Sequence, residues 1–173
     1  TVTRAPKLYL LTNDDEFAVL YAKLEAAFAT GLIALLQIRR KKTLQLPDGA
    51  TKLYDEALQI VRLAKTYDVP VVINDDIKLA EKLGVGVHLG QQDGNINDAK
   101  RQLAPKQIIG RTCHGDVDLV KEAKKEGASY AAMGAVFASN TKPNANIISR
   151  QELIEGCQQG IDICVIGGLS AEN

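Results

Sequence analysis

Residues 68–90 have the sequence DVPVVINDDIKLAEKLGVGVHLG, and this stretch decides the fold. The apolar run Val71–Asp75 ends in polar residues, and a short helix-like segment, Ile77–Leu83, follows it and stops at Gly84. A second apolar run, Val85–Gly90, comes directly afterwards. A strand, a helix and a strand in this order predict a βαβ unit, whose two strands are parallel.

The same alternation extends over the whole chain. The strand-like runs are Leu8–Thr12, Ile33–Arg39, Val71–Asp75, Val85–Gly90, Ile108–His114, Tyr130–Phe137 and Ile161–Gly168. The helix-like segments are Asp14–Thr30, Lys52–Tyr67, Ile77–Leu83, Asn97–Leu103, Asp116–Glu126 and Ser149–Gln159. We expect helix caps at Asp14, Asp76, Asp116 and Ser149, and loops at Thr43–Thr51 and Asn140–Ile147.

Two parallel architectures fit this alternation. A doubly wound sheet that binds a dinucleotide is expected to have a glycine-rich first turn, and Thr12–Asp15 contains no glycine. A barrel instead places polar residues after nearly every strand, as this chain does. We therefore expect an α/β fold, a (β/α)8 TIM barrel, as a single domain over residues 1–173 with its last βα unit missing. We also expect a gap one strand wide between strands one and seven, and a natural chain that continues past Asn173.

Composition narrows the class of partner. Lys and Arg total 21, as do Asp and Glu, and this balance argues against nucleic acid or a membrane surface as the partner. No apolar stretch approaches the roughly 18 residues of a membrane span. The three cysteines form no CxxC pair, and their odd number favours a reducing, cytoplasmic location and structural roles. We expect small-molecule substrates, while a homo-oligomer is left open.

Basic residues gather at the end of the second strand. Gln37, Arg39 and Lys41 are spaced two apart, so all three can face the mouth of a barrel. An arginine fork and a lysine charge at this spacing suit a di- or triphosphate. A solvated basic run is the alternative, because Arg40 and Lys42 fill the gaps.

Carboxylates follow the third and fourth strands. Asp76 is the better helix cap, which leaves Asp75 available as a metal ligand, and Asp93 comes shortly after the next strand. Magnesium takes one or two carboxylates together with phosphate oxygens. Two carboxylates opposite a basic cluster therefore indicate a Mg²⁺–pyrophosphate site.

Other strand ends carry weaker signals. We interpret His88 as a hydrogen-bonded core residue, and His114 as either a residue of the barrel mouth or a loop histidine. Ser139–Lys142 combines hydroxyls and a lysine in a loop that could close over an anion. Backbone amides at Gly167-Gly168 match the phosphate site of many barrels. A surface turn and a chain bend are the alternative explanations of these two segments.

These segments, in this order, resemble the thiamine phosphate synthase family over essentially the whole chain. The matching segments are Gln37–Lys41, Val72–Asp75, Gly86–Asp93, Ile109–His114, Gly134–Lys142 and Ile166–Gly168. The resemblance implies an enzyme that joins a hydroxymethylpyrimidine diphosphate to a thiazole phosphate and releases pyrophosphate. It also implies a dissociative reaction that needs no protein nucleophile.

The resemblance also implies a set of site residues. The pyrimidine diphosphate would be bound by Gln37, Ile38, Arg39, Arg40, Lys41, Asn74, Thr112 and Lys142. Of these, Arg39, Thr112 and Lys142 would be catalytic. Mg²⁺ would be held by Asp75 and Asp93, and the thiazole phosphate by Ser139, Asn140, Thr141 and Gly168.

The chain departs from the family pattern at several positions. Gln92 stands where glutamate is usual, Ser139 where threonine is usual, and Arg111-Thr112-Cys113 where Val-Ser-Thr is usual. Thr112 and Ser139 keep a hydroxyl, so we expect binding to survive. The family gives no reason for a charge at Arg111.

Two rival functions are considered. A related thiazole tautomerase has the same barrel, and His114 could be its acid–base group. A tautomerase has no diphosphate–Mg²⁺ complex to hold, so the basic and acidic residues of the predicted site favour the synthase. A non-catalytic thiamine-phosphate-binding domain is the second rival, and turnover of the two substrates would exclude it.

Overall fold

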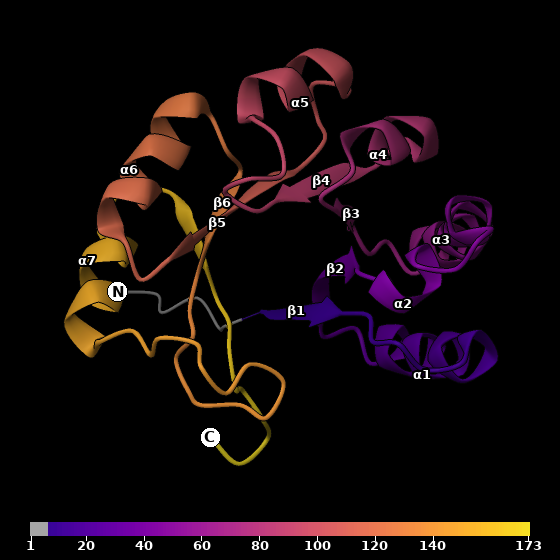
Figure 1. The fold of residues 1–173 in the computed structure, drawn as a ribbon, viewed down its shortest axis with the longest axis horizontal. Helices are drawn as coiled ribbons and strands as arrows, with labels where there is room; N and C mark the ends of the chain where they lie inside the picture. Colours follow the sequence, from indigo (N-terminus) through magenta and orange to yellow (C-terminus); the bar gives the residue numbers. More distant parts are fainter. Residues whose placement is uncertain (1–6) are drawn as a thin grey trace. The chain divides into compact units, whose positions relative to one another are not determined.

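The computed structural model describes residues 7–173, in which strands and helices alternate along the chain (Figure 1). The strands are β1 (Leu8–Leu11), β2 (Ile33–Ile38), β3 (Val71–Asn74), β4 (Gly86–Leu89), β5 (Ile109–His114), β6 (Tyr130–Met133) and β7 (Asp162–Val165). The helices are α1 (Phe17–Ala29), α2 (Lys41–Leu44), α3 (Gly49–Thr66), α4 (Ile77–Leu83), α5 (Ile96–Gln102), α6 (Val117–Glu126) and α7 (Arg150–Cys157). The chain divides into two compact units, one ending at Val87 and the other beginning at His88.

The first unit contains three adjacent parallel strands. β1 pairs with β2, with Leu11 opposite Gln37, and β2 pairs with β3, with Ile38 opposite Ile73. Parallel pairing in this register brings the turns that follow the three strands to one edge of the sheet. The residues that follow each strand can therefore form a common site.

Helices α1 and α3 supply much of the core of the first unit. Leu20, Leu24 and Phe28, spaced four residues apart, are buried along α1. The corresponding face of α3 buries Leu53, Ala57, Ile60, Leu63 and Ala64. Apolar residues at helical spacing form one face of each helix, and this face packs into the core.

The second unit has the same organisation. β5 pairs with β6 and β6 with β7, all parallel, and every residue of β6 is buried. Gly110 in β5 is required by close packing, because a side chain there would overlap the ring of Tyr130. The carboxyl ends of these strands again lie along one edge.

The start of the chain differs from the sequence-based expectation at two places. Asp14 was expected to cap α1, but the cap is Glu16, and Asp14 Oδ1 instead accepts a hydrogen bond from the Lys42 backbone N–H at 3.2 Å. The expected loop at 43–51 overlaps α2 and the first turn of α3. α3 begins at Gly49, where a side chain would overlap the Leu44 carbonyl.

The sixth strand is shorter than expected. It ends at Met133, whereas the sequence predicted a strand as far as Phe137. Beyond Met133 the backbone of Val136 and Phe137 still bonds to the segment after β7, at 3.1 and 3.0 Å, but outside a regular ladder. The expected caps Asp76 and Asp116 and the Ser149–Glu152 capping box are all confirmed.

The structure leaves three expectations about the whole chain as predictions. The first is that the chain forms a single domain, and the second is that it continues past Asn173. The third is a gap one strand wide between β1 and β7, two strands that lie in different units. Within residues 7–173, none of the helices is both long enough and apolar enough to cross a bilayer.

Candidate functional site

A chain of polar contacts joins the ends of β2 and β3. Arg39 Nη1 donates to Asn74 Oδ1 at 3.2 Å, and Asn74 Nδ2 donates to Asp75 Oδ2 at 2.9 Å. All three side chains are part-exposed. A cation, an amide and a carboxylate from two neighbouring strand ends are thereby brought together, as the sequence predicted.

Asp75 has an unusual backbone conformation. Its φ is +65°, in the left-handed region that residues other than glycine seldom adopt. Aspartate tolerates this region better than most residues, and such outliers gather at functional sites. The conformation turns the chain directly after β3, before Asp76 caps α4.

Two predicted binding residues on β2 have buried side chains. Ile38 is 2% exposed and forms part of the core. Gln37 is 3% exposed, and its Nε2 donates to the Tyr9 hydroxyl at 2.6 Å. The Ile38 side chain is therefore enclosed by protein, and any binding role of this residue would have to come from its backbone.

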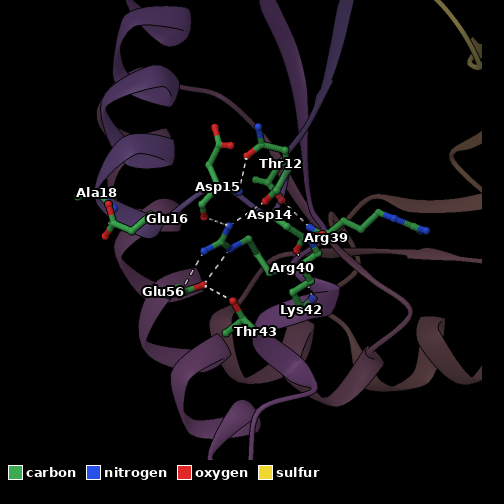
Figure 2. Close-up of polar contacts among 11 residues, drawn as sticks. Thr12, Asp14, Asp15, Glu16, Ala18, Arg39, Arg40, Lys42, Thr43 and Glu56 are labelled. Carbon is green, nitrogen blue, oxygen red and sulfur yellow. Dashed lines mark hydrogen bonds and ion pairs between the residues drawn. The ribbon is translucent and has the colours of Figure 1, made fainter. Parts of the chain in front are cut away.

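The Arg40 guanidinium is bound within the protein. Its Nε and Nη2 contact the two carboxylate oxygens of Glu56 on α3 at 3.0 and 3.3 Å, and its Nη1 donates to the carbonyls of Asn13 and Asp15 at 2.9 and 2.5 Å (Figure 2). Only 4% of the side chain is exposed. The guanidinium therefore binds Glu56 and two backbone carbonyls within the protein, and its contact with the diphosphate stays a prediction.

The turn after β2 is held so that Arg39 and Arg40 separate. The Arg39 backbone N–H donates to the buried Thr12 hydroxyl at 2.8 Å, while its side chain extends away from the Arg40–Glu56 pair (Figure 2). Lys41, expected to continue the alternation of a strand, is instead the first residue of α2, where it is exposed. The contacts of Arg40 and Thr12 thus fix the turn from which Arg39 and Lys41 project.

In the second unit, Thr112 contacts the buried His88. His88 Nε2 lies 2.8 Å from the Thr112 hydroxyl, and Nδ1 lies 2.7 Å from the Tyr130 hydroxyl, with the two rings stacked. His88 is 6% exposed, which confirms its interpretation as a hydrogen-bonded core residue. Its contact orients the hydroxyl of a predicted substrate-binding residue, a role that the sequence did not indicate. His114 is exposed at the end of β5.

Asp93 lies in the exposed loop between β4 and α5. The side-chain amide of Gln91 in this loop donates to the Thr112 carbonyl at 2.6 Å. Among residues 7–173, no group of three or more His, Cys, Asp or Glu side chains is arranged to hold a metal. Carboxylates such as Asp75 and Asp93 do fit Mg²⁺, which binds oxygen ligands and usually keeps waters and substrate phosphates among them.

The loop after β6 packs on the turn after β7. The Phe137 N–H donates to the Gly167 carbonyl at 3.0 Å, and the Ser139 hydroxyl accepts a hydrogen bond from the Lys142 N–H at 3.3 Å. A Cβ on Gly168 would lie 2.6 Å from the Phe137 carbonyl oxygen. The structure therefore brings the predicted phosphate-binding segments, Ser139–Lys142 and Gly168, to the same place.

Cys113 and Cys164 are not activated as nucleophiles. Burial raises the pKa of the Cys113 thiol and of the Cys164 thiol to about 11, so both stay protonated near neutral pH. Cys157 is exposed, and all three are free thiols. The environments of Cys113 and Cys164 agree with the structural roles expected from the sequence.

Comparisons with known proteins all point to one family. The model of the family TMP-TENI, thiamine monophosphate synthase, matches residues 8–173. A thiamine-phosphate synthase from Chromobacterium violaceum is 37% identical over 98% of this chain and 80% of its own length. Another from Saccharophagus degradans is 40% identical over 90% of this chain and 70% of its own.

A solved structure gives the same result. Thiamine phosphate pyrophosphorylase from Pyrococcus furiosus superposes with a TM-score of 0.79 and 27% identity, over 96% of this chain and 77% of that one. The fold class expected from the sequence, an α/β barrel of the TIM type, is confirmed. The chain belongs to the thiamine monophosphate synthase family and is an enzyme of thiamine biosynthesis.

Proposed function

We propose that the chain condenses 4-amino-2-methyl-5-hydroxymethylpyrimidine diphosphate with 4-methyl-5-hydroxyethylthiazole phosphate, or its carboxylated form, to give thiamine phosphate and pyrophosphate. In this reaction the bond between the pyrimidine methylene carbon and the diphosphate oxygen breaks, and a bond from that carbon to the thiazole nitrogen forms. Its substrates are small molecules. The balanced charge and the free thiols support a cytoplasmic enzyme without a nucleic-acid or membrane partner.

The observation that carries the proposal is the contact chain Arg39–Asn74–Asp75 at the ends of β2 and β3. Arg39 supplies a planar cation suited to phosphate oxygens, with Lys41 two residues away. Asn74 orients the carboxylate of Asp75. This arrangement would bind a diphosphate and align it for departure.

Residues after the other strands complete the proposed site. Thr112, oriented by His88, and Lys142 would contact the diphosphate, and the loop residues Ser139, Asn140 and Thr141 with Gly168 would hold the thiazole phosphate. Asp75 and Asp93 would hold Mg²⁺, which, when bound, neutralises the charge that grows on the leaving pyrophosphate. Arg39 and Lys142 would stabilise that same charge directly.

The decisive experiment measures pyrophosphate release from the two substrates, with and without Mg²⁺. We expect release only when both substrates and the metal are present, with thiamine phosphate formed in equal amount. Conversion of a thiazole substrate without the diphosphate would indicate a tautomerase instead. Binding of thiamine phosphate without any turnover would indicate a non-catalytic domain.

Lys142→Ala should lower kcat about a hundredfold, because the lysine opposes charge that develops in the transition state. The KM for the pyrimidine diphosphate should change much less, since the ground state carries less of that charge at the breaking bond. Steady-state kinetics would separate the two effects. Lys106→Ala, an exposed lysine between α5 and β5, is the matched control and should leave both constants unchanged. A Lys142→Ala protein in which only the KM is raised would show that Lys142 stabilises the bound substrate and the transition state equally.

Gly168→Ala should raise the KM for the thiazole phosphate and leave the KM for the pyrimidine diphosphate unchanged. The new Cβ would lie 2.6 and 2.7 Å from the carbonyls of Phe137 and Ala138, so the loop after β6 would have to move. Gly31→Ala is a close control: its φ of +71° matches the +67° of Gly168, but nothing lies within 4 Å of the added carbon. If both variants raise this KM equally, the effect comes from backbone strain alone. That result would contradict the assignment of Gly168 to the thiazole-phosphate site.

A further inference from the structure

Arg111 of β5 is a buried arginine that the family pattern does not explain. Only 9% of its side chain is exposed. Its Nη1 donates to the Gly90 carbonyl at 2.8 Å and to the Gly94 carbonyl at 3.0 Å, and its Nη2 lies 3.7 Å from Glu126 Oε2. One guanidinium nitrogen therefore holds both ends of the segment 90–94.

This segment has little internal structure of its own. Residues 91–94 are exposed, and the backbone bond within the segment, from the Asp93 N–H to the Gly90 carbonyl, is long at 3.3 Å. Gly94 has a φ of +124°, a conformation that glycine adopts without the steric cost of a side chain. A second contact between this segment and β5 is the hydrogen bond that the Gln91 side-chain amide donates to the Thr112 carbonyl at 2.6 Å.

We propose that Arg111 is a positioning residue: it fixes the loop 90–94 and thereby sets where the Asp93 carboxylate stands for Mg²⁺. This inference rests on the proposed function, in which Asp93 is a metal ligand. Arg111 itself touches neither substrate nor metal in this proposal. A buried arginine is costly unless its donors are bonded, and here the two loop carbonyls and Glu126 supply the partners. The hydrogen bonds to the loop thus explain why Arg111 stands where the family usually has valine.

The test compares Arg111→Met with Arg101→Met, an exposed arginine on α5 as control. Residues that orient metal ligands typically contribute 10–100-fold to metal affinity, so in Arg111→Met the Mg²⁺ concentration for half-maximal activity should rise about tenfold. Turnover at saturating Mg²⁺ should fall much less. Mn²⁺ binding, followed by electron paramagnetic resonance without substrate turnover, should weaken by a similar factor. Amide hydrogen exchange of residues 91–94 should quicken in the metal-free protein.

The outcomes separate this inference from the proposed function. If the parent protein neither binds Mn²⁺ nor requires Mg²⁺, the metal assignment itself fails. If the parent does both and Arg111→Met shows unchanged metal dependence, Arg111 has only a structural role and the inference is wrong, even when the loop exchanges faster. If Arg111→Met does not fold, Arg111→Lys decides: it keeps the charge without the planar fork and should show a smaller shift in the same direction. No shift in that variant overturns the inference.

Discussion

Glu56→Ala should lower the free energy of unfolding by about 3 kcal/mol, because it leaves the Arg40 guanidinium buried without its counter-charge. The pair is bidentate, at 3.0 and 3.3 Å, and the two side chains are only 4% and 16% exposed. Glu56 also accepts a hydrogen bond from the buried Thr43 hydroxyl at 3.4 Å (Figure 2). Chemical denaturation monitored by circular dichroism would measure the loss.

Two controls isolate the burial of the charge as the cause. Lys23→Ala removes the exposed ion pair with Asp15, whose side chains are 62% and 34% exposed, and should cost no more than about 1 kcal/mol. The double variant Arg40→Met/Glu56→Leu removes both charges and should be less destabilised than Glu56→Ala. A Glu56→Ala protein as stable as the Lys23→Ala protein would show that the Arg40 charge reaches water.

The Arg40–Glu56 pair marks a limit of sequence-based prediction. The spacing of Gln37, Arg39 and Lys41 predicted that Arg39 and Arg40 point to opposite sides, and the two side chains do contact different partners, Asn74 and Glu56. The same spacing could not show what Arg40 would meet. Glu56 is sixteen residues further along the chain, and it reaches Arg40 because α3 packs on α2, the helix that begins directly after Arg40.

Local signals were the reliable ones. Asp76, Asp116 and the Ser149–Glu152 pair were predicted as caps and act as caps, because capping depends on residues two or three apart in sequence. Asp14 failed as a predicted cap since its carboxylate bonds to the Lys42 backbone, a partner from another turn. The seven predicted strands all exist, although their bounds differ from the predicted ones. The sixth strand, for example, ends at Met133 rather than at Phe137.

In the candidate site, too, local features were predictable and contacts between distant residues were not. The residue types and their places after the strands were predictable, as was the family, because both depend on short motifs. The contacts that support the site were not predictable from the sequence, because they join residues 17 to 24 positions apart. They are the contact of His88 with Thr112 and the contacts of Arg111 with the carbonyls of Gly90 and Gly94. Buried polar side chains find their partners through packing, which short motifs do not encode.

Asp75→Asn and Asp93→Asn should each lower kcat/KM about a thousandfold, because each removes a charge that would hold Mg²⁺ on the departing pyrophosphate. Asparagine is chosen for Asp75 because it tolerates the left-handed backbone at φ +65° and keeps the size of the side chain. An alanine there would add backbone strain to the loss of charge. Pyrophosphate release across a Mg²⁺ titration is the measurement, with Mn²⁺ binding followed separately.

Asp76→Asn is the matched control, because Asp76 lies next to Asp75 and carries the same charge. Its carboxylate caps α4 by accepting a hydrogen bond from the Leu79 N–H at 2.9 Å, and asparagine caps a helix about as well. Stability, activity and Mg²⁺ dependence should therefore all stay at the parent level in Asp76→Asn. The loss in Asp75→Asn can then be assigned to one carboxylate rather than to the negative charge of the segment. Near-parent turnover in both Asp75→Asn and Asp93→Asn would contradict the metal assignment, and the role of Arg111 in placing Asp93 would lose its basis as well.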